Sequence, residues 1–547
     1  MRRTVCWLAV LILAGLALGA CSLRTGQQET TTLPAFDVLA QRIPAAVDNA
    51  FFFDFKPDDP AAQHWAAIRS RLEQNPQMQQ GLENLLDRFR VEAYGLEAVI
   101  EGPAATALWD GTTVVLLPVL DEAAAWDRMV HNLGDAQAWE QETVEGRLIY
   151  HGRFWEAGNQ PTHLAWTMDK DLLYLAYRPD SRSVDRLADL LELARGASLA
   201  ALDSWEVLRQ RLPDDPLAVV FVPVAELAGR PTPVPVNPPA AGDQPPSAAL
   251  ERHLEALALA FTPEDAGLRM DIQGVLDPDA GAEPALQALF KLPAVEAAGW
   301  DRLPANTALA LLSHDAPAIL PWFSGIFGLD LGPETPFGAA AGLDLQADLL
   351  GEGGPLMGPF ALAVTPPLPA QPISQGLPAL QALLASREVL PAQVERLAAA
   401  LEGRGAVLDT ADLTGMELRT QVGTQLSGYA LSFGLDGGTL YMGSNPQIIE
   451  QAVVAGSEGS GLLSTAAFQA VLPQLPEGSF LLGYVSSQPL IELIQFNTDG
   501  EQDGPSAVVQ FLDAFDAMGI GLRLESEPAG GAGPGRVEGV AYFLMEE

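Results

Sequence analysis

One stretch of this chain occurs twice, and that repeat constrains the architecture more than any other feature of the sequence. Residues 196–222 align without a gap on residues 459–485, at a constant offset of 263 positions. The alignment places Trp205 on Phe468, so that an aromatic residue matches an aromatic residue. Self-similarity at a fixed spacing indicates a repeated structural unit. We therefore predict two copies of one module.

Further matches lie upstream and downstream of this stretch. Residues 43–45 correspond to residues 303–305 at an offset of 260, and residues 256–276 correspond to residues 518–543. Such similar offsets over a long stretch are difficult to obtain by chance. Each module therefore spans about 260 residues, which is near the upper end of the usual size of a domain.

The repeat also predicts where one module ends and the next begins. We expect the first module at residues 39–280 and the second at residues 300–547, with the junction near residues 277–301. The proline-rich segment 230–247 has the composition of an extended linker. Its position in the repeat instead makes it a loop inside the first module, and its counterpart in the second is the polar loop 497–506.

The local pattern predicts antiparallel hairpins together with helices. We expect hairpins at residues 105–119, 164–176 and 429–442, where apolar runs flank short turns such as Asp110-Gly111, a dipeptide that favours tight turns. Helices are expected at residues 61–89, 122–133, 184–194, 394–401 and 446–455, the last capped by Ser444 or Asn445. Because hairpins dominate, we predict the α+β class, with a mainly antiparallel sheet and packed helices in each module.

Three motifs resemble those of a known group of proteins. They are the Leu-Pro-Ala at residues 303–305, the Gly-Ala-Ser-Leu at 196–199 that leads to Leu-Pro-Asp-Asp at 212–215, and the Trp-Asp-Gly turn at 109–111. Together they resemble a bacterial family of secreted or membrane-anchored domains of unknown function, over most of residues 40–545. The resemblance implies two tandem copies of that domain and brings no catalytic residues with it.

The N-terminal segment has the pattern of a secretory signal. Arg2 and Arg3 precede an apolar run at residues 6–16, and Leu-Gly-Ala-Cys follows at residues 18–21. This resembles the bacterial lipoprotein signal, in which the cysteine, here Cys21, is acylated after cleavage of the chain before it. A plain signal peptide cut after Ala20, or an uncleaved helix, is the alternative, but the apolar run is short for a membrane span.

This interpretation assigns the first 38 residues and the compartment. Residues 1–20 become the lipoprotein signal peptide, and residues 21–38 become a tether. The mature protein is then extracytoplasmic, in the periplasm or on the cell surface, and the lipid on Cys21 attaches it to a membrane.

The composition excludes several classes of function. The chain of 547 residues has 70 acidic and 30 basic residues, and removal of Arg2 and Arg3 with the signal leaves a net charge of −42. We expect no binding to nucleic acid, because so negative a surface repels phosphate backbones. Cys6 is lost with the signal and Cys21 carries lipid, so the mature body has no disulfide, thiolate metal site or cysteine nucleophile.

No catalytic motif is present in the sequence. No serine has glycine at both −2 and +2, and neither a phosphate loop nor a Gly-x-Gly-x-x-Gly run occurs. No two histidines have the spacing of a helical zinc site. The histidines are His64, His131, His151, His163, His253 and His314. We therefore predict no catalytic residue and no cofactor.

Metal sites are also not expected. His151 and His163, with Asp169, would form a site only if neighbouring strands brought them together, and ordinary histidines are favoured. The acidic loops 277–283 and 497–504 space oxygen ligands as calcium loops do, but neither completes the twelve-residue pattern. Solvated turns are the favoured interpretation for both loops.

Tryptophans provide the remaining candidates. An exposed set would stack on sugars or line an apolar groove, but core packing is the more common role of large aromatic residues. The tryptophans of the mature chain are Trp65, Trp109, Trp126, Trp139, Trp155, Trp166, Trp205, Trp300 and Trp322. The match of Trp205 to Phe468 predicts that both lie in a core.

These observations favour a non-catalytic binding or scaffold protein of the cell envelope, anchored by lipid, with a protein or a hydrophobic ligand as its partner. The repeat duplicates a fold without duplicating any polar constellation in the sequence. A carrier of a lipid or other hydrophobic ligand is one alternative, and it requires an apolar pocket at equivalent places in both modules. An envelope hydrolase is the other, and it requires converging His, Asp and Ser side chains.

Overall fold

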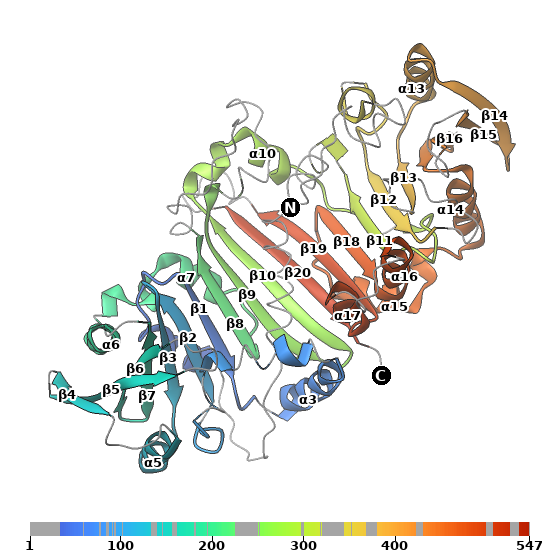
Figure 1. Ribbon diagram of the computed structural model, residues 1–547. Coiled ribbons are helices and arrows are strands. Elements are labelled where there is room, and N and C mark those ends of the chain that lie inside the picture. The colour runs from blue at the N-terminus through green and yellow to red at the C-terminus, as the bar shows by residue number, and fades with distance from the viewer. Residues whose placement is uncertain are drawn as a thin grey trace. The chain divides into compact units, whose positions relative to one another are not determined.

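The computed structural model describes residues 33–545 in two compact units (Figure 1). The first unit contains residues 33–224 and 254–277, and the second contains residues 278–545 together with the few described residues at 250–253. Not described within this range are residues 58, 76–77, 82, 84–86, 90, 92–93, 101, 133–138, 145, 156–160, 180–181, 194, 225–249, 251, 297–299, 315, 318, 320–343, 352, 368–379, 423–429, 499–506 and 526–534.

The described strands of the first unit form one antiparallel sheet. Their order across the sheet is β4-β5-β6-β7-β3-β2-β1-β8-β9-β10, and every neighbouring pair runs antiparallel. The strands are β1 (Asn49–Asp54), β2 (Pro103–Trp109), β3 (Thr112–Pro118), β4 (Glu140–Val144), β5 (Arg147–Trp155), β6 (Pro161–Asp169), β7 (Leu172–Arg178), β8 (Ala218–Pro223), β9 (Leu254–Glu264) and β10 (Gly267–Leu276).

Helices cover both faces of this sheet. Helices α2 (Leu33–Ala40), α6 (Ser183–Leu191) and α7 (Asp203–Arg209) bury apolar side chains in one core with Phe52, Leu116 and Phe221. Successive residues of a strand point to opposite faces, and Phe53 accordingly packs on the other face, against Trp65 of α3 (Asp59–Glu73). Helix α5 (Glu122–Asn132) lies on that second face, because its Trp126 contacts Trp166 in the row of Phe51.

In the second unit, the described strands again form an antiparallel sheet. The order is β14-β15-β16-β17-β13-β12-β11-β18-β19-β20. The strands at corresponding places in the two orders follow one another along the chain in the same way, so the two units have the same strand order. The strands are β11 (Leu309–Ser313), β12 (Phe360–Thr365), β13 (Gln381–Ser386), β14 (Val407–Leu413), β15 (Met416–Val422), β16 (Ser432–Asp436), β17 (Thr439–Gly443), β18 (Leu481–Ser486), β19 (Ala517–Glu525) and β20 (Arg536–Leu544).

Helices α14 (Pro446–Glu458) and α15 (Ala466–Val471) close the core face of this second sheet. Helix α13 (Pro391–Gly403) packs on the opposite face, where its Glu395 pairs with Arg419 of β15 at 2.6 Å. Other α-helices in the described part of the unit include α10 (Pro284–Phe290), α16 (Ser487–Thr498) and α17 (Ala507–Asp513). No helix in the described part of the chain has the length and apolarity needed to cross a membrane.

The three predicted hairpins are confirmed as β2–β3, β6–β7 and β16–β17. Their turns require positive φ, which Asp110 and Gly111 adopt at 47° and 70°, and which Gly437 and Gly438 adopt at 55° and 84°. Glycine accepts this conformation without steric cost. The α+β class and the mainly antiparallel sheets are likewise observed.

Helix boundaries follow the sequence signals in most places. Asn445 caps α14 by accepting a hydrogen bond from the backbone N–H of Ile448 at 3.1 Å, so Asn445 and not Ser444 is the cap. The single helix expected at 61–89 is wrong, because α3 ends at Glu73 and the backbone turns at residues 74–75. Pro76 follows in the sequence, and a proline disfavours helical backbone in the residue before it.

The proline-rich segment 230–247 lies outside the described residues. It connects β8 and β9, which pair with each other in the first unit. At the same place in the strand order of the second unit, between β18 and β19, lie α16 and α17. The first compact unit ends at residue 277, and the main part of the second begins at residue 278.

Trp205 and Phe468 are both buried, as predicted, at 3% and 2% exposure. The ring of Trp205 contacts Phe221 edge-on at 5.3 Å between centroids, and the ring of Phe468 contacts Tyr484 edge-on at 5.0 Å. Such pairs add to the energy of apolar burial. Each core is therefore centred on the same aromatic contact between its short helix and its sheet.

Candidate functional site

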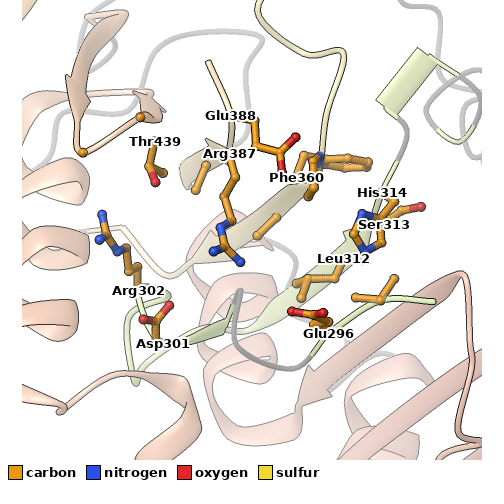
Figure 2. A pocket seen from close by; sticks show the side chains of 16 residues that line it. Glu296, Asp301, Arg302, Leu312, Ser313, His314, Phe360, Arg387, Glu388 and Thr439 are labelled. Atoms are coloured by element: carbon orange, nitrogen blue, oxygen red, sulfur yellow. The ribbon is translucent and has the colours of Figure 1, made fainter. Parts of the chain in front are cut away.

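A pocket opens at one end of the core face of the second sheet, and it is the candidate site (Figure 2). Its volume is about 320 Å³, which is within the range of small-molecule sites. Three structural parts line it. They are the ends of β11, β12 and β13, the turn before β17, and the residues at 295–296 and 301–302.

Two rows of side chains form the strand wall of the pocket. The first row is Leu312, Ala361 and Ala385, which are direct partners across β11, β12 and β13. The second row lies two residues beyond the first, on the same face. It consists of His314, Pro359 and Arg387 at the ends of β11, β12 and β13, together with Thr439 at the start of β17. The small side chain of Ala385 leaves the space that the pocket occupies.

Buried contacts hold residues 295–296 and 301–302 in place beside this wall. Trp300 and Leu303 lie in the core, and the backbone carbonyl of Leu303 accepts a hydrogen bond from the N–H of Leu462 at 2.7 Å. At the other end, the N–H of Val295 donates to the carbonyl of Ser479 at 2.7 Å. These anchors position the side chains of Asp301, Arg302 and Glu296 at the pocket.

Arg302 is held by two partners. Its guanidinium donates a hydrogen bond to the hydroxyl of Tyr441 and lies 3.4 Å from a carboxylate oxygen of Asp436. Burial works against the charged form of Arg302, but the bond to Tyr441 and the nearby carboxylates raise the pKa of the guanidinium above its ordinary value. Arg302 therefore stays charged and fixed at the edge of the pocket.

Arg387 differs from Arg302 in having no such partner. Its side chain extends into the pocket toward the space between Asp301 and Glu296 (Figure 2). No carboxylate of the described residues lies within ion-pair distance of its guanidinium. Its backbone is fixed, because its N–H donates to the carbonyl of Pro359 at 2.8 Å.

Glu388, next to Arg387 at the rim, has a left-handed backbone with φ of 64°. This conformation is unfavourable for a residue other than glycine. The N–H of Val389 then donates to the carbonyl of Gly438 at 3.0 Å. In the first unit Val119 makes the equivalent bond to Asp171, directly after Pro118, so Glu388 is one extra residue at this corner of the second unit.

The pocket does not contain an activated serine among the described residues. The hydroxyl of Ser313 is buried and donates to the carbonyl of Phe480 at 2.8 Å. His314 is its neighbour in sequence, at the end of the same strand, and the two side chains are not hydrogen bonded to each other. A nucleophile requires a base within hydrogen-bond reach, and this geometry does not supply one.

The other sequence candidates lie apart. His163 is opposite Arg153, whose Nε donates to its Nε2 at 2.9 Å, whereas His151 lies 3.9 Å from Glu140. No group of three metal-ligating side chains occurs within the described ranges. The first acidic loop forms a short 3-10 turn, Pro278–Ala282, and the second, 497–504, lies almost wholly outside the described residues.

Cys21, the predicted lipidation site, lies outside the described residues, as do Trp322 and the side chain of Trp155. Among the other tryptophans, Trp65, Trp166 and Trp300 are buried, as is Trp205. Trp126, Tyr150 and Trp166 form a contact cluster with centroid distances of 4.6 to 4.8 Å. These rings pack mainly on one another.

An arginine near a buried tyrosine occurs in each unit and was not among the sequence candidates. Arg302 faces Tyr441, and Arg42 lies close enough to Tyr174 to act on its hydroxyl. Burial raises the pKa of both tyrosines, and the neighbouring arginine acts in the opposite direction. An arginine thus acts on a buried tyrosine in each unit.

A signal for this contact was present in the sequence. The offset of 260 that matches residues 43–45 to residues 303–305 also places Arg42 on Arg302. The tyrosines match through the sheet, since Tyr174 pairs with Leu116 and Tyr441 pairs with Ala385 at the same place in the strand order. The two tyrosines are separated by a different offset from that of the two arginines, so the alignment of the repeat does not match them.

Comparisons with known proteins give little further information. No family model and no curated protein matches the chain. Three solved structures, described as crystal forms I, IV and III of TP0453, share 11%, 11% and 12% identity with it. They cover 43%, 43% and 49% of this chain and 78%, 79% and 90% of their own, each with a TM-score of 0.24, which does not establish a common fold.

Proposed function

We propose that this protein is a lipid-anchored, non-catalytic binding protein of the cell envelope, built from two copies of one module, of which the second binds a small ligand in its pocket. Acylated Cys21 attaches it to the membrane, and the tether of residues 21–38 connects the anchor to the first module. The N-terminal sequence pattern supports the anchor. The pocket supports the binding role.

The duplication is supported by contacts that match one to one. The N–H of Leu199 donates to the carbonyl of Ile43 at 2.7 Å, and the N–H of Leu462 donates to the carbonyl of Leu303 at the same distance. The strand order and the aromatic contact beneath the short helix also correspond. Neither backbone contact is a general requirement of antiparallel sheets.

The observation that carries the binding role is that the second unit has a pocket beside a row whose counterpart in the first unit carries larger side chains. Cross-strand partners put Phe52 at the position of Leu312, and Leu116 at the position of Ala385. Phe52 and Leu116 are fully buried. Because one copy of the fold packs this region with larger side chains, the fold itself does not require the space in the other copy.

The anchor is tested by replacing its cysteine. If Cys21 is acylated, the wild-type protein partitions into the detergent phase, and Cys21→Ser either remains an uncleaved precursor or is released from the membrane. Phase separation and mass spectrometry of the mature N-terminus measure both outcomes. Equal membrane attachment of the two forms would contradict the anchor.

The pocket is tested by replacing Ala385 with the residue type found at the corresponding position of the first unit. Ala385→Leu places there the residue found at Leu116, and we expect it to reduce at least tenfold the amount of small molecule retained on purification from native envelopes. Mass spectrometry of extracted ligand measures the retention. Val407→Leu, at a side chain 62% exposed on β14, is the matched control. Equal retention by wild type and Ala385→Leu, or no retained molecule, would overturn the binding role.

A further inference from the structure

The pocket carries charges of both signs within a small volume. Arg302 and Arg387 supply positive charge, and Glu296, Asp301 and Glu388 supply negative charge. Within the described part of the chain, neither Arg387 nor Glu296 is in an ion pair. Arg387, Glu296, Asp301 and Glu388 are exposed at the mouth of the pocket, so a charged ligand can reach them.

Comparison with the first unit distinguishes the charged residue that both units share from the charged residues that occur only in the second unit. Arg302 corresponds to Arg42, and each arginine acts on a buried tyrosine of its own unit, so this charge is common to both units. Arg387 instead stands where the first unit has Pro118, and Asp301 stands where it has Gln41. The charges that the fold does not share are therefore those that face the open space.

We propose that the pocket binds a small zwitterion, a molecule with an ammonium group and a carboxylate group a few bonds apart. This inference rests on the proposed binding role. The carboxylate of the ligand pairs with the guanidinium of Arg387, whose planar fork suits such a group. The ammonium group pairs with the carboxylate of Glu296 or Asp301, which lie on either side of the space toward which Arg387 points in Figure 2.

The two sets of charges select against simpler ligands. An anion without an ammonium group meets Arg387 but also the repulsion of Glu296 and Asp301. A cation without a carboxylate meets those acids but also the repulsion of Arg387. Specificity of this kind combines attraction to one ligand with repulsion of others.

Three small peptides that differ only in their terminal charges test the proposal. The probes are Ala-Ala, which is zwitterionic, N-acetyl-Ala-Ala, which keeps only the carboxylate, and Ala-Ala amide, which keeps only the ammonium group. We expect isothermal titration calorimetry on the full-length mature protein, at pH 6.5 and low salt, to show that Ala-Ala binds. We expect either cap to weaken binding at least tenfold. Low salt is chosen because dissolved ions screen exposed charges.

Two substitutions then locate the contacts. Arg387→Gln is expected to weaken Ala-Ala at least tenfold and to remove the difference between Ala-Ala and its amide. Glu296→Gln is expected to weaken Ala-Ala and to remove much of the difference between Ala-Ala and its N-acetyl form. Arg396→Gln is the control, because this exposed arginine of α13 bonds to the carbonyl of Gly353 and does not line the pocket.

Several outcomes would overturn the zwitterion. They are the absence of binding by all three peptides, equal binding of Ala-Ala and a capped form, and unchanged binding by Arg387→Gln. Failure here is distinct from failure of the binding role itself. A small molecule that wild type retains from envelopes and Ala385→Leu does not would leave the binding role intact and assign the pocket to another class of ligand.

Discussion

A chain of residues 22–229 is expected to lose the cooperative unfolding of the first unit, whereas a chain of residues 22–277 is expected to keep it. The shorter chain lacks β9 and β10, which occupy one side of the first sheet. Strand β8 would then lose one of its two partners, and the core would lose Ala256, Ala258, Ala260 and Val275. Helix α7, which contacts β9 and β10, would lose part of its packing surface.

Urea denaturation followed by near-ultraviolet circular dichroism measures this difference, and binding of a hydrophobic dye reports exposed apolar surface. The composition of the proline-rich segment would place a boundary there, so the shorter chain tests that alternative directly. A cooperative transition in the shorter chain, with none in the longer, would move the boundary to the proline-rich segment.

Trp205→Ala and Phe468→Ala are each expected to destabilise their own unit by about 3 to 5 kcal/mol, as truncation of a large buried aromatic residue does. Trp205 packs between Phe52 and Phe221, with ring centroids at 5.3 Å from each. Phe468 packs between Trp300 and Tyr484, at 5.2 and 5.0 Å. Either truncation leaves a cavity beneath the short helix, between α7 or α15 and its sheet.

Denaturant melts of the full chain and of each variant provide the measurement. Leu148→Ala, at a side chain 41% exposed, is the control and should change the midpoint little. A midpoint unchanged by Trp205→Ala would mean that the burial of this ring does not stabilise the first unit. Trp205 would then again be a candidate for contact with a ligand.

Local structure was predictable wherever a few adjacent residues decide it. Asp110-Gly111 and Gly437-Gly438 accept positive φ, so their hairpins form where the sequence places them. Asn445 followed by Pro446 starts α14 for the same local reason, since the side chain reaches the N–H of Ile448. The burial of Trp205 and Phe468 followed from their equivalence in the repeat.

The pocket was not predictable, because it depends on residues that are far apart in sequence. Leu312, Ala361, Ala385 and Tyr441 become neighbours only through the pairing of four strands. Arg387 is unremarkable among the arginines of the sequence until that pairing places it in the wall. The same is true of the Arg302–Tyr441 contact, which crosses 139 positions of the chain.

By itself, the sequence therefore determined the turns, the cap of α14, the buried aromatic pair and the absence of cysteine after residue 21, since adjacent residues, the repeat or the composition decide each of these. Only the tertiary structure decided that one sheet fills its core row with Phe52 and Leu116, whereas the other leaves a charged pocket beside Leu312 and Ala385. The physical reason is that a cavity is the volume left by all the side chains around it, and those side chains come from strands whose register no short stretch of sequence contains.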